Sequence, residues 1–132
     1  MAFARYTARL LNQEAFSSNN GSSPFQYYLV PKPVGGKADR EDHQQRFWVV
    51  FALEQGEGGT VDGYLDHSIG NGSWTAASSS NLAGPGNKVT EMKEATNLAP
   101  WIKARVTVGS GATFKGTIWL CSNRPFRLLE GG

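Results

Sequence analysis

The last third of the chain contains two runs, 101–108 and 113–120, in which apolar and polar residues alternate. One side of each run is apolar: Ile102, Ala104, Val106 and Val108 in the first, and Phe114, Gly116, Ile118 and Leu120 in the second. A period of two is typical of strands, because successive side chains leave opposite faces of a pleated backbone. The connection 109–112 contains two glycines, which supply the positive φ angles of tight hairpin loops. A hairpin with one apolar face needs a second sheet to cover it, so the pattern predicts an all-β sandwich or barrel.

Segments of strand type recur along the rest of the chain between turns rich in Gly, Ser and Asn: 2–11, 25–30, 46–54, 60–69, a short strand from Trp74, 88–96 and 125–129. Segment 88–96 alternates only roughly, and we assign it as a strand because its neighbours are strands. The whole pattern predicts one antiparallel β-sandwich or jelly-roll-like domain of eight or nine strands over residues 1–132. We expect residues 1–12 to form either an edge strand or an assembly arm that reaches a neighbouring subunit.

The run 46–54 is the most continuously apolar segment of the chain. Such a run is typical of a central strand covered on both faces, which predicts a core position for Trp48. Trp119 differs, because it lies on the polar side of its run, beside Lys115 and Thr117. An aromatic residue on the solvent side of a sheet lies either under a loop or in a contact surface. A row of exposed, coplanar rings would also suit a carbohydrate-binding module.

Composition excludes several classes of protein. The chain has 16 glycines and only 18% charged residues, a balance typical of many short strands rather than a helical bundle. A net charge of +2, with no run of Lys and Arg among aromatics, argues against a nucleic-acid partner. The first residues lack the apolar core of a signal peptide, and no stretch approaches the roughly 20 apolar residues of a membrane helix. We therefore expect synthesis in the cytoplasm and no membrane partner.

No motif for catalysis, metal binding or a cofactor is found in the sequence. The nearest cluster is Asp62, Asp66 and His67, but on a strand the histidine leaves the opposite face from the two carboxylates. The three could converge only at a bulge, so a solvated strand face is the better interpretation. A single cysteine, Cys121, excludes an internal disulfide and is expected to be a small residue at the edge of the core. We expect a protein that is not an enzyme, with no metal and no cofactor.

Three segments in the second half carry a resemblance: Leu65-Asp66-His67-Ser68-Ile69-Gly70-Asn71-Gly72-Ser73-Trp74, residues 96–108 from Thr96-Asn97-Leu98-Ala99-Pro100-Trp101 onward, and Thr117-Ile118-Trp119-Leu120. Their order resembles small β-sandwich virion proteins of tailed bacteriophages, of the capsid decoration (cement) type. That pattern has a turn S-x-D-G-x-x-W followed by L-A-P-x-[IV]-R-A-x-[LV]-T. Here Gly70-Asn71-Gly72-Ser73-Trp74 replaces the first element imperfectly, and Lys103-Ala104-Arg105 shifts the charge of the second.

The resemblance implies a decoration protein that binds and stabilises the assembled head at the capsid surface of the virion. Its partners would be the major capsid protein and further copies of itself, with a homotrimer favoured. We expect partner contacts at six residues: Phe3, Arg5, Tyr6, Arg9, Trp74 and Trp119. Two alternatives stay open: a carbohydrate- or receptor-binding β-sandwich module of a tail fibre, and a head–tail connector or tail-terminator protein that forms a ring.

Overall fold

A computed structural model describes residues 6–17, 21–22, 26–31, 45–109 and 111–131, and the side chains of all of these except 13–17 and 21–22. The described residues form strands and no helix, which confirms the predicted all-β class. The strands are β1 (Tyr6–Ser17), β2 (Gly21–Ser22), β3 (Gln26–Pro31), β4 (Phe47–Gln55), β5 (Thr60–Ser68), β6 (Thr75–Ala83), β7 (Lys88–Ala95), β8 (Trp101–Val108), β9 (Thr113–Ser122) and β10 (Phe126–Gly131). The ambiguous segment 88–96 is therefore a strand as far as Ala95.

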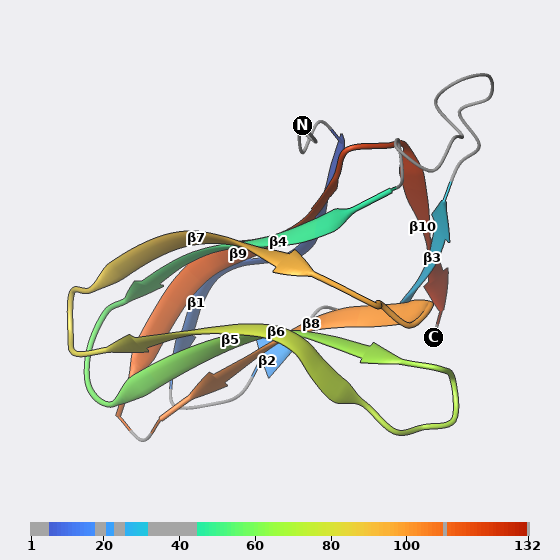
Figure 1. The fold of residues 1–132 in the computed structure, drawn as a ribbon. Coiled ribbons are helices and arrows are strands. Elements are labelled where there is room, and N and C mark those ends of the chain that lie inside the picture. The colour runs from blue at the N-terminus through green and yellow to red at the C-terminus, as the bar shows by residue number, and fades with distance from the viewer. Residues whose placement is uncertain (1–5, 18–20, 23–25, 32–44, 110, 132) are drawn as a thin grey trace.

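Two antiparallel sheets pack face to face as a β-sandwich (Figure 1). Sheet A has the strand order β1-β9-β4-β7. Sheet B has the order β10-β3-β8-β5-β6, and the short strand β2 also pairs with β8. At one end β3 and β10 turn out of the plane of sheet B and stand between the two layers (Figure 1). There Phe126 of β10 meets Phe47 of sheet A edge-to-face, with ring centroids 5.7 Å apart, so the pair closes that end of the core.

The two alternating runs form β8 and β9, and their apolar sides face the core as predicted. The predicted hairpin between them is wrong, because β8 lies in sheet B and β9 in sheet A. The connection at 109–112 crosses from one sheet to the other, and the amide of Gly109 donates to the carbonyl of Thr60. A period of two predicts which face of the sheet each side chain lies on, but it does not predict which strands pair with each other. Here the two apolar faces cover each other across the sandwich instead of lying side by side.

Strand β1 is the edge strand of sheet A and pairs with β9 over most of its length. A register shift between Arg9 and Leu11 gives β1 one extra residue, Leu10. Leu10 and Leu11 are both buried, with 2% and 1% of their surface exposed. The described part of the predicted arm, residues 6–12, is thus built into the sheet and the core; residues 1–5 lie outside the described residues.

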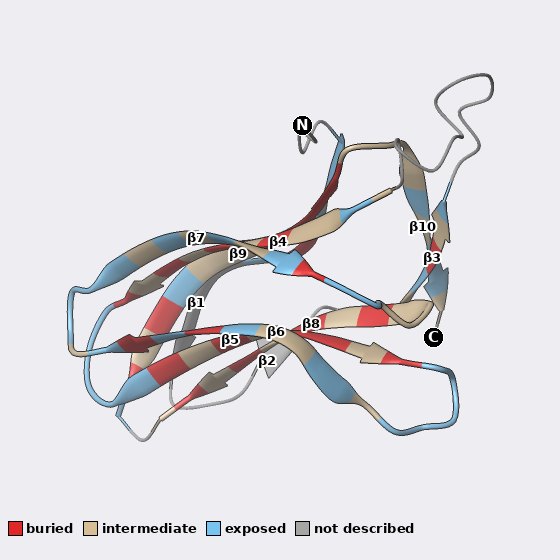
Figure 2. Ribbon diagram, viewed as in Figure 1, coloured by how far each residue is buried: buried red, intermediate tan, exposed pale blue. Residues whose placement is uncertain are grey.

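Strand β4 lies in the middle of sheet A, between β9 and β7. Its inner residues Val49, Phe51 and Leu53 are buried in the core. Its outward residues are only half-buried: Trp48, Val50, Ala52 and Glu54. The prediction of a strand covered on both faces, with Trp48 in the core, is therefore wrong. Three of the four outward residues are apolar, which hides the alternation in the sequence, while the described residues place no further layer over this side (Figure 2).

Candidate functional site

The outer face of sheet A carries a ridge of large side chains next to a groove of small ones. Three residues in cross-strand register form the ridge: Trp119, Val50 and Met92. Two residues further along each strand, the residues in register are Thr117, Ala52 and Thr90, which form the groove. A hollow of about 700 Å³ lies over the groove, bordered by Asn12, Glu54, Lys88 and Lys115. Met92, at the end of the ridge on the edge strand β7, is 53% exposed.

Charged residues surround this ridge and groove. The guanidinium of Arg9 lies 5.7 Å from the ring centre of Trp119, within the range of a cation–π contact. Beyond the ridge, Arg46 donates two hydrogen bonds to Glu94, from Nε at 2.7 Å and Nη2 at 2.8 Å. Beyond the groove, the ammonium groups of Lys88 and Lys115 lie 3.7 and 3.8 Å from the carboxylate of Glu54. An apolar centre with a charged border is the usual anatomy of a protein–protein interface.

The centre of the outer face of sheet B is built differently. The side chain of Asp66 on β5 is only 3% exposed. Arg105 on β8 donates to both carboxylate oxygens, from Nε to Oδ2 at 2.6 Å and from Nη2 to Oδ1 at 3.2 Å. The guanidinium also lies 3.9 Å from the ring centre of Tyr64, and the hydrogen bond to Asp66 raises the pKa of Arg105. A buried carboxylate is thus satisfied by a cation of its own fold.

The end of sheet B near β3 and β10 exposes apolar side chains. Tyr28 is 39% exposed and its register partner on β10, Leu129, is 46% exposed. Trp101 lies beside Tyr28 with ring centroids 5.1 Å apart and planes at 77°, so these two rings do not form the coplanar row that stacks on sugars. Ile69, in the turn after β5, is 74% exposed. We call Tyr28, Leu129 and Trp101 the corner patch.

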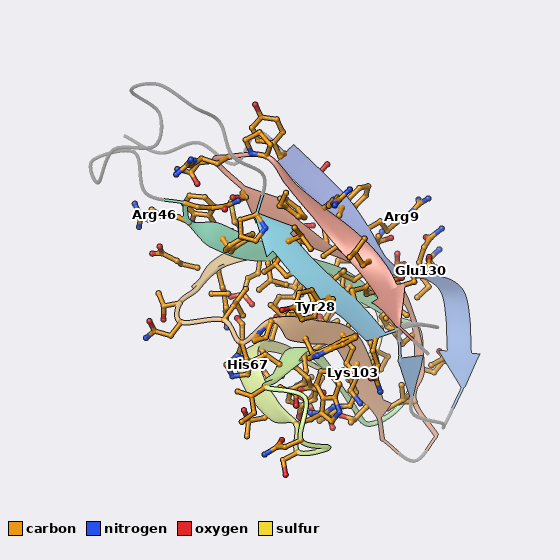
Figure 3. The ribbon with its side chains drawn as sticks, turned by 90° about the vertical axis from the view of Figure 1, so that its right-hand side faces the viewer. Arg9, Tyr28, Arg46, His67, Lys103 and Glu130 are labelled. Atoms are coloured by element: carbon orange, nitrogen blue, oxygen red, sulfur yellow. The ribbon has the colours of Figure 1, made fainter. Side chains whose placement is uncertain are left out.

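The expected contact residues fall on different parts of the molecule. Arg9 and Trp119 lie on the outer face of sheet A, and Tyr6 is 41% exposed at the start of β1. Trp74 lies on the sheet B side, where the ammonium of Lys103 is 4.5 Å from its ring centre. Figure 3 separates the two sides, with Arg9 and Arg46 toward sheet A and Lys103 toward sheet B. Phe3 and Arg5 lie outside the described residues.

Sequence reasoning missed three of the exposed apolar residues: Met92, Tyr28 and Leu129. Met92 could have been found from its position on the same side of an alternating strand as the charged residues Lys88 and Glu94. The positions of Tyr28 and Leu129 depend on how β3 and β10 bend, for which the sequence has no local signal.

The carboxylates and histidine of β5 each have separate partners. Asp66 binds Arg105, the hydroxyl of Thr107 lies 3.5 Å from Oδ2 of Asp62, and Nδ1 of His67 accepts the amide of Ala99 at 3.0 Å. The described part of the chain contains no group of three or more His, Cys, Asp or Glu residues that could hold a metal ion. Cys121 is buried at 3% exposure, and this burial raises the pKa of its thiol. Among the described residues we find no helix that could span a membrane.

No family model matches the chain, and no curated protein matches it. Among solved structures, the chain is similar to a family two carbohydrate esterase from Cellvibrio japonicus, at 8% identity and a TM-score of 0.41. The alignment covers 96% of this chain and 35% of the esterase chain, so this chain spans about a third of that protein. A similarity of this size carries no argument about activity.

Proposed function

We propose that the protein is a bacteriophage virion structural protein, of the capsid decoration type, that binds and stabilises the assembled head as a homo-oligomer. The β-sandwich fold and the resemblance of segments 65–74, 96–108 and 117–120 support this proposal. The observation that carries it is the presence of exposed apolar side chains on two separate surfaces, at Met92 on sheet A and at Tyr28 and Leu129 in the corner patch. A decoration protein needs two such surfaces, one for sister subunits and one for the shell.

The physical argument rests on what the two surfaces have in common. Contiguous apolar patches on a folded protein mark contact sites, and interfaces are enriched in Trp, Tyr, Met and Arg. Both surfaces combine an exposed apolar residue with a tryptophan: Met92 shares a row with Trp119, with Val50 between them, and Tyr28 lies beside Trp101. Each contact is small, but subunits held together on a symmetric shell raise the local concentration of one another. Many weak contacts then give firm attachment.

Binding to heads tests the proposal directly. Heads of the encoding phage that lack the protein are mixed with the purified chain, and bound protein is measured by co-sedimentation. We expect saturable binding and an increase in the temperature at which the heads rupture. Replacing Tyr28 and Leu129 together by Ser should weaken binding at least ten-fold, whereas Glu57→Gln, in an exposed turn, serves as the matched control. Absence of binding to heads at any concentration would refute the proposal.

A carbohydrate- or receptor-binding module is the second candidate. Trp74 and Trp101 favour it, because both lie on the outer side of sheet B beside polar groups of β5 and β8. Binding to a glycan array, lost in Trp74→Ala and in Trp101→Ala, would support this function over head binding. A chain that binds heads and no glycan on the array would exclude it.

A further inference from the structure

The ridge and the groove on the outer face of sheet A have the same length and direction. Both cross the strands β9, β4 and β7, and each ridge residue has a groove residue two positions along its own strand. Rows on one face of a sheet lie about 6.8 Å apart, because each residue advances about 3.4 Å. The face thus presents a raised row and a lowered row next to each other. Such a surface is complementary to a copy of itself.

A two-fold axis brings these rows together in only one way. The axis must lie in the plane of contact, run across the strands and pass between ridge and groove. Each ridge residue then faces a small residue of the other copy: Trp119 faces Thr117, Val50 faces Ala52 and Met92 faces Thr90. An axis along the strands would instead place ridge on ridge and leave both hollows of about 700 Å³ unfilled. Contacts of the first kind are isologous, with the same patch on both subunits.

The charges beyond the two rows fit the same arrangement. The row beyond the ridge contains Glu94, in register with Trp48, and the row beyond the groove contains Lys88, in register with Glu54. The axis across the strands places Glu94 of one copy opposite Lys88 of the other, twice in each pair. Both residues already have a partner within their own chain, Arg46 for Glu94 and Glu54 for Lys88. Pairing would join these into two charge networks of alternating sign.

We infer that the outer face of sheet A binds a second copy of this chain, face to face about a two-fold axis across the strands. This inference deepens the proposed function, on which its biological role rests, by assigning one of the two surfaces to the sister subunit. Four strands and four rows cover about 500 Å² per copy, less than the roughly 800 Å² per partner of a standard interface. The isolated pair is therefore weak, and it differs from the homotrimer that the resemblance favours.

Sedimentation velocity of the full-length chain, from about 1 µM to about 1 mM, tests the inference without heads. We expect a reversible monomer–dimer equilibrium. Lys88→Glu and Glu94→Lys should each weaken it at least ten-fold, because each creates two like-charge contacts. The double variant should restore it to within about three-fold of the original. If each single variant weakened association only by disturbing its own site, the double variant would not restore it.

A second variant tests the shape argument. Thr90→Tyr fills the groove at an exposed position of β7 and suits a strand, so we expect a folded monomer. The matched control is Thr75→Tyr, at an exposed position of β6 in sheet B, which should dimerise normally. A chain that is monomeric throughout, has the mass of three chains, or dimerises equally well with Thr90→Tyr would overturn the inference. Head binding is measured separately, so either proposal can fail while the other stands.

Discussion

The two outer faces of this sandwich use the same kinds of residue for different ends. On sheet B the central cation, Arg105, lies over Tyr64 and binds Asp66, whose side chain is 3% exposed. On sheet A the cation Arg46 binds Glu94, whose side chain is 35% exposed, and the apolar ridge beside them stays uncovered. When a carboxylate is buried within the fold, the stability of the folded protein depends on the cation that pairs with it. An exposed pair at the edge of an apolar ridge contributes little to the fold and is available to another molecule.

The largest expected effect comes from deleting residues 1–12. This deletion tests whether β1 is an assembly arm that contacts another subunit or a structural strand of the domain. The deletion removes Leu10 and Leu11 from the core, and truncating one buried leucine costs about 2–5 kcal/mol. Two such losses approach the whole stability of a typical domain, about 5–15 kcal/mol. We expect the cooperative melting transition to disappear in calorimetry. A deletion variant that melts as the full chain does would show that β1 is an arm after all; Leu10→Ala alone should still fold.

The next effect separates the two ion pairs. Arg105→Met leaves the buried carboxylate of Asp66 without its partner and should lower the free energy of unfolding by about 2 kcal/mol or more. The matched change on sheet A, Arg46→Met, removes an exposed pair and should move the urea midpoint much less. Urea denaturation of both variants measures the difference. Equal losses would contradict the distinction between the two faces.

A smaller effect on the fold, with a large effect on association, is expected at Met92. Met92→Thr trims a side chain that is 53% exposed on a strand, so the free energy of unfolding should change by less than about 0.5 kcal/mol. The same change removes one end of the ridge and should shift the monomer–dimer equilibrium toward monomer. Parallel denaturation and sedimentation experiments show whether stability and self-association separate. If the free energy of unfolding and self-association both decrease, the ridge serves to stabilise the fold.

The smallest effect is the pH dependence of the Glu94 pair. The hydrogen bond from Arg46 lowers the pKa of Glu94, so its stabilising contribution is present above the pKa of the unfolded chain. It is lost as the pH falls through the lowered pKa of the folded chain. Wild type should therefore exceed Glu94→Gln slightly in melting temperature near about pH 7, and the difference should vanish in strong acid. A difference that stays constant across this range would show that the pair is not its cause.

The sequence predicts which residues face the core better than it predicts which strands pair with each other or what the outer surfaces look like. Alternation in β8 and β9 assigned their core residues correctly, because burial on one side imposes a period of two. It did not show that the strands lie in different sheets, since two apolar faces can cover each other equally well. Trp48 was misplaced because an apolar outer row looks the same in sequence as a row under a second layer. The pair of Asp66 and Arg105 joins residues 39 apart and follows only from the register of β5 against β8.

Hydroxyl-radical footprinting of dilute protein, concentrated protein and protein bound to heads tests most directly whether the two outer surfaces serve different partners. Met92 and Tyr28 are the probes, at 53% and 39% exposure. We predict that concentration protects Met92 and leaves Tyr28 reactive, and that head binding protects Tyr28. Equal reactivity of Met92 at every concentration, or protection of Tyr28 by concentration alone, would contradict the account.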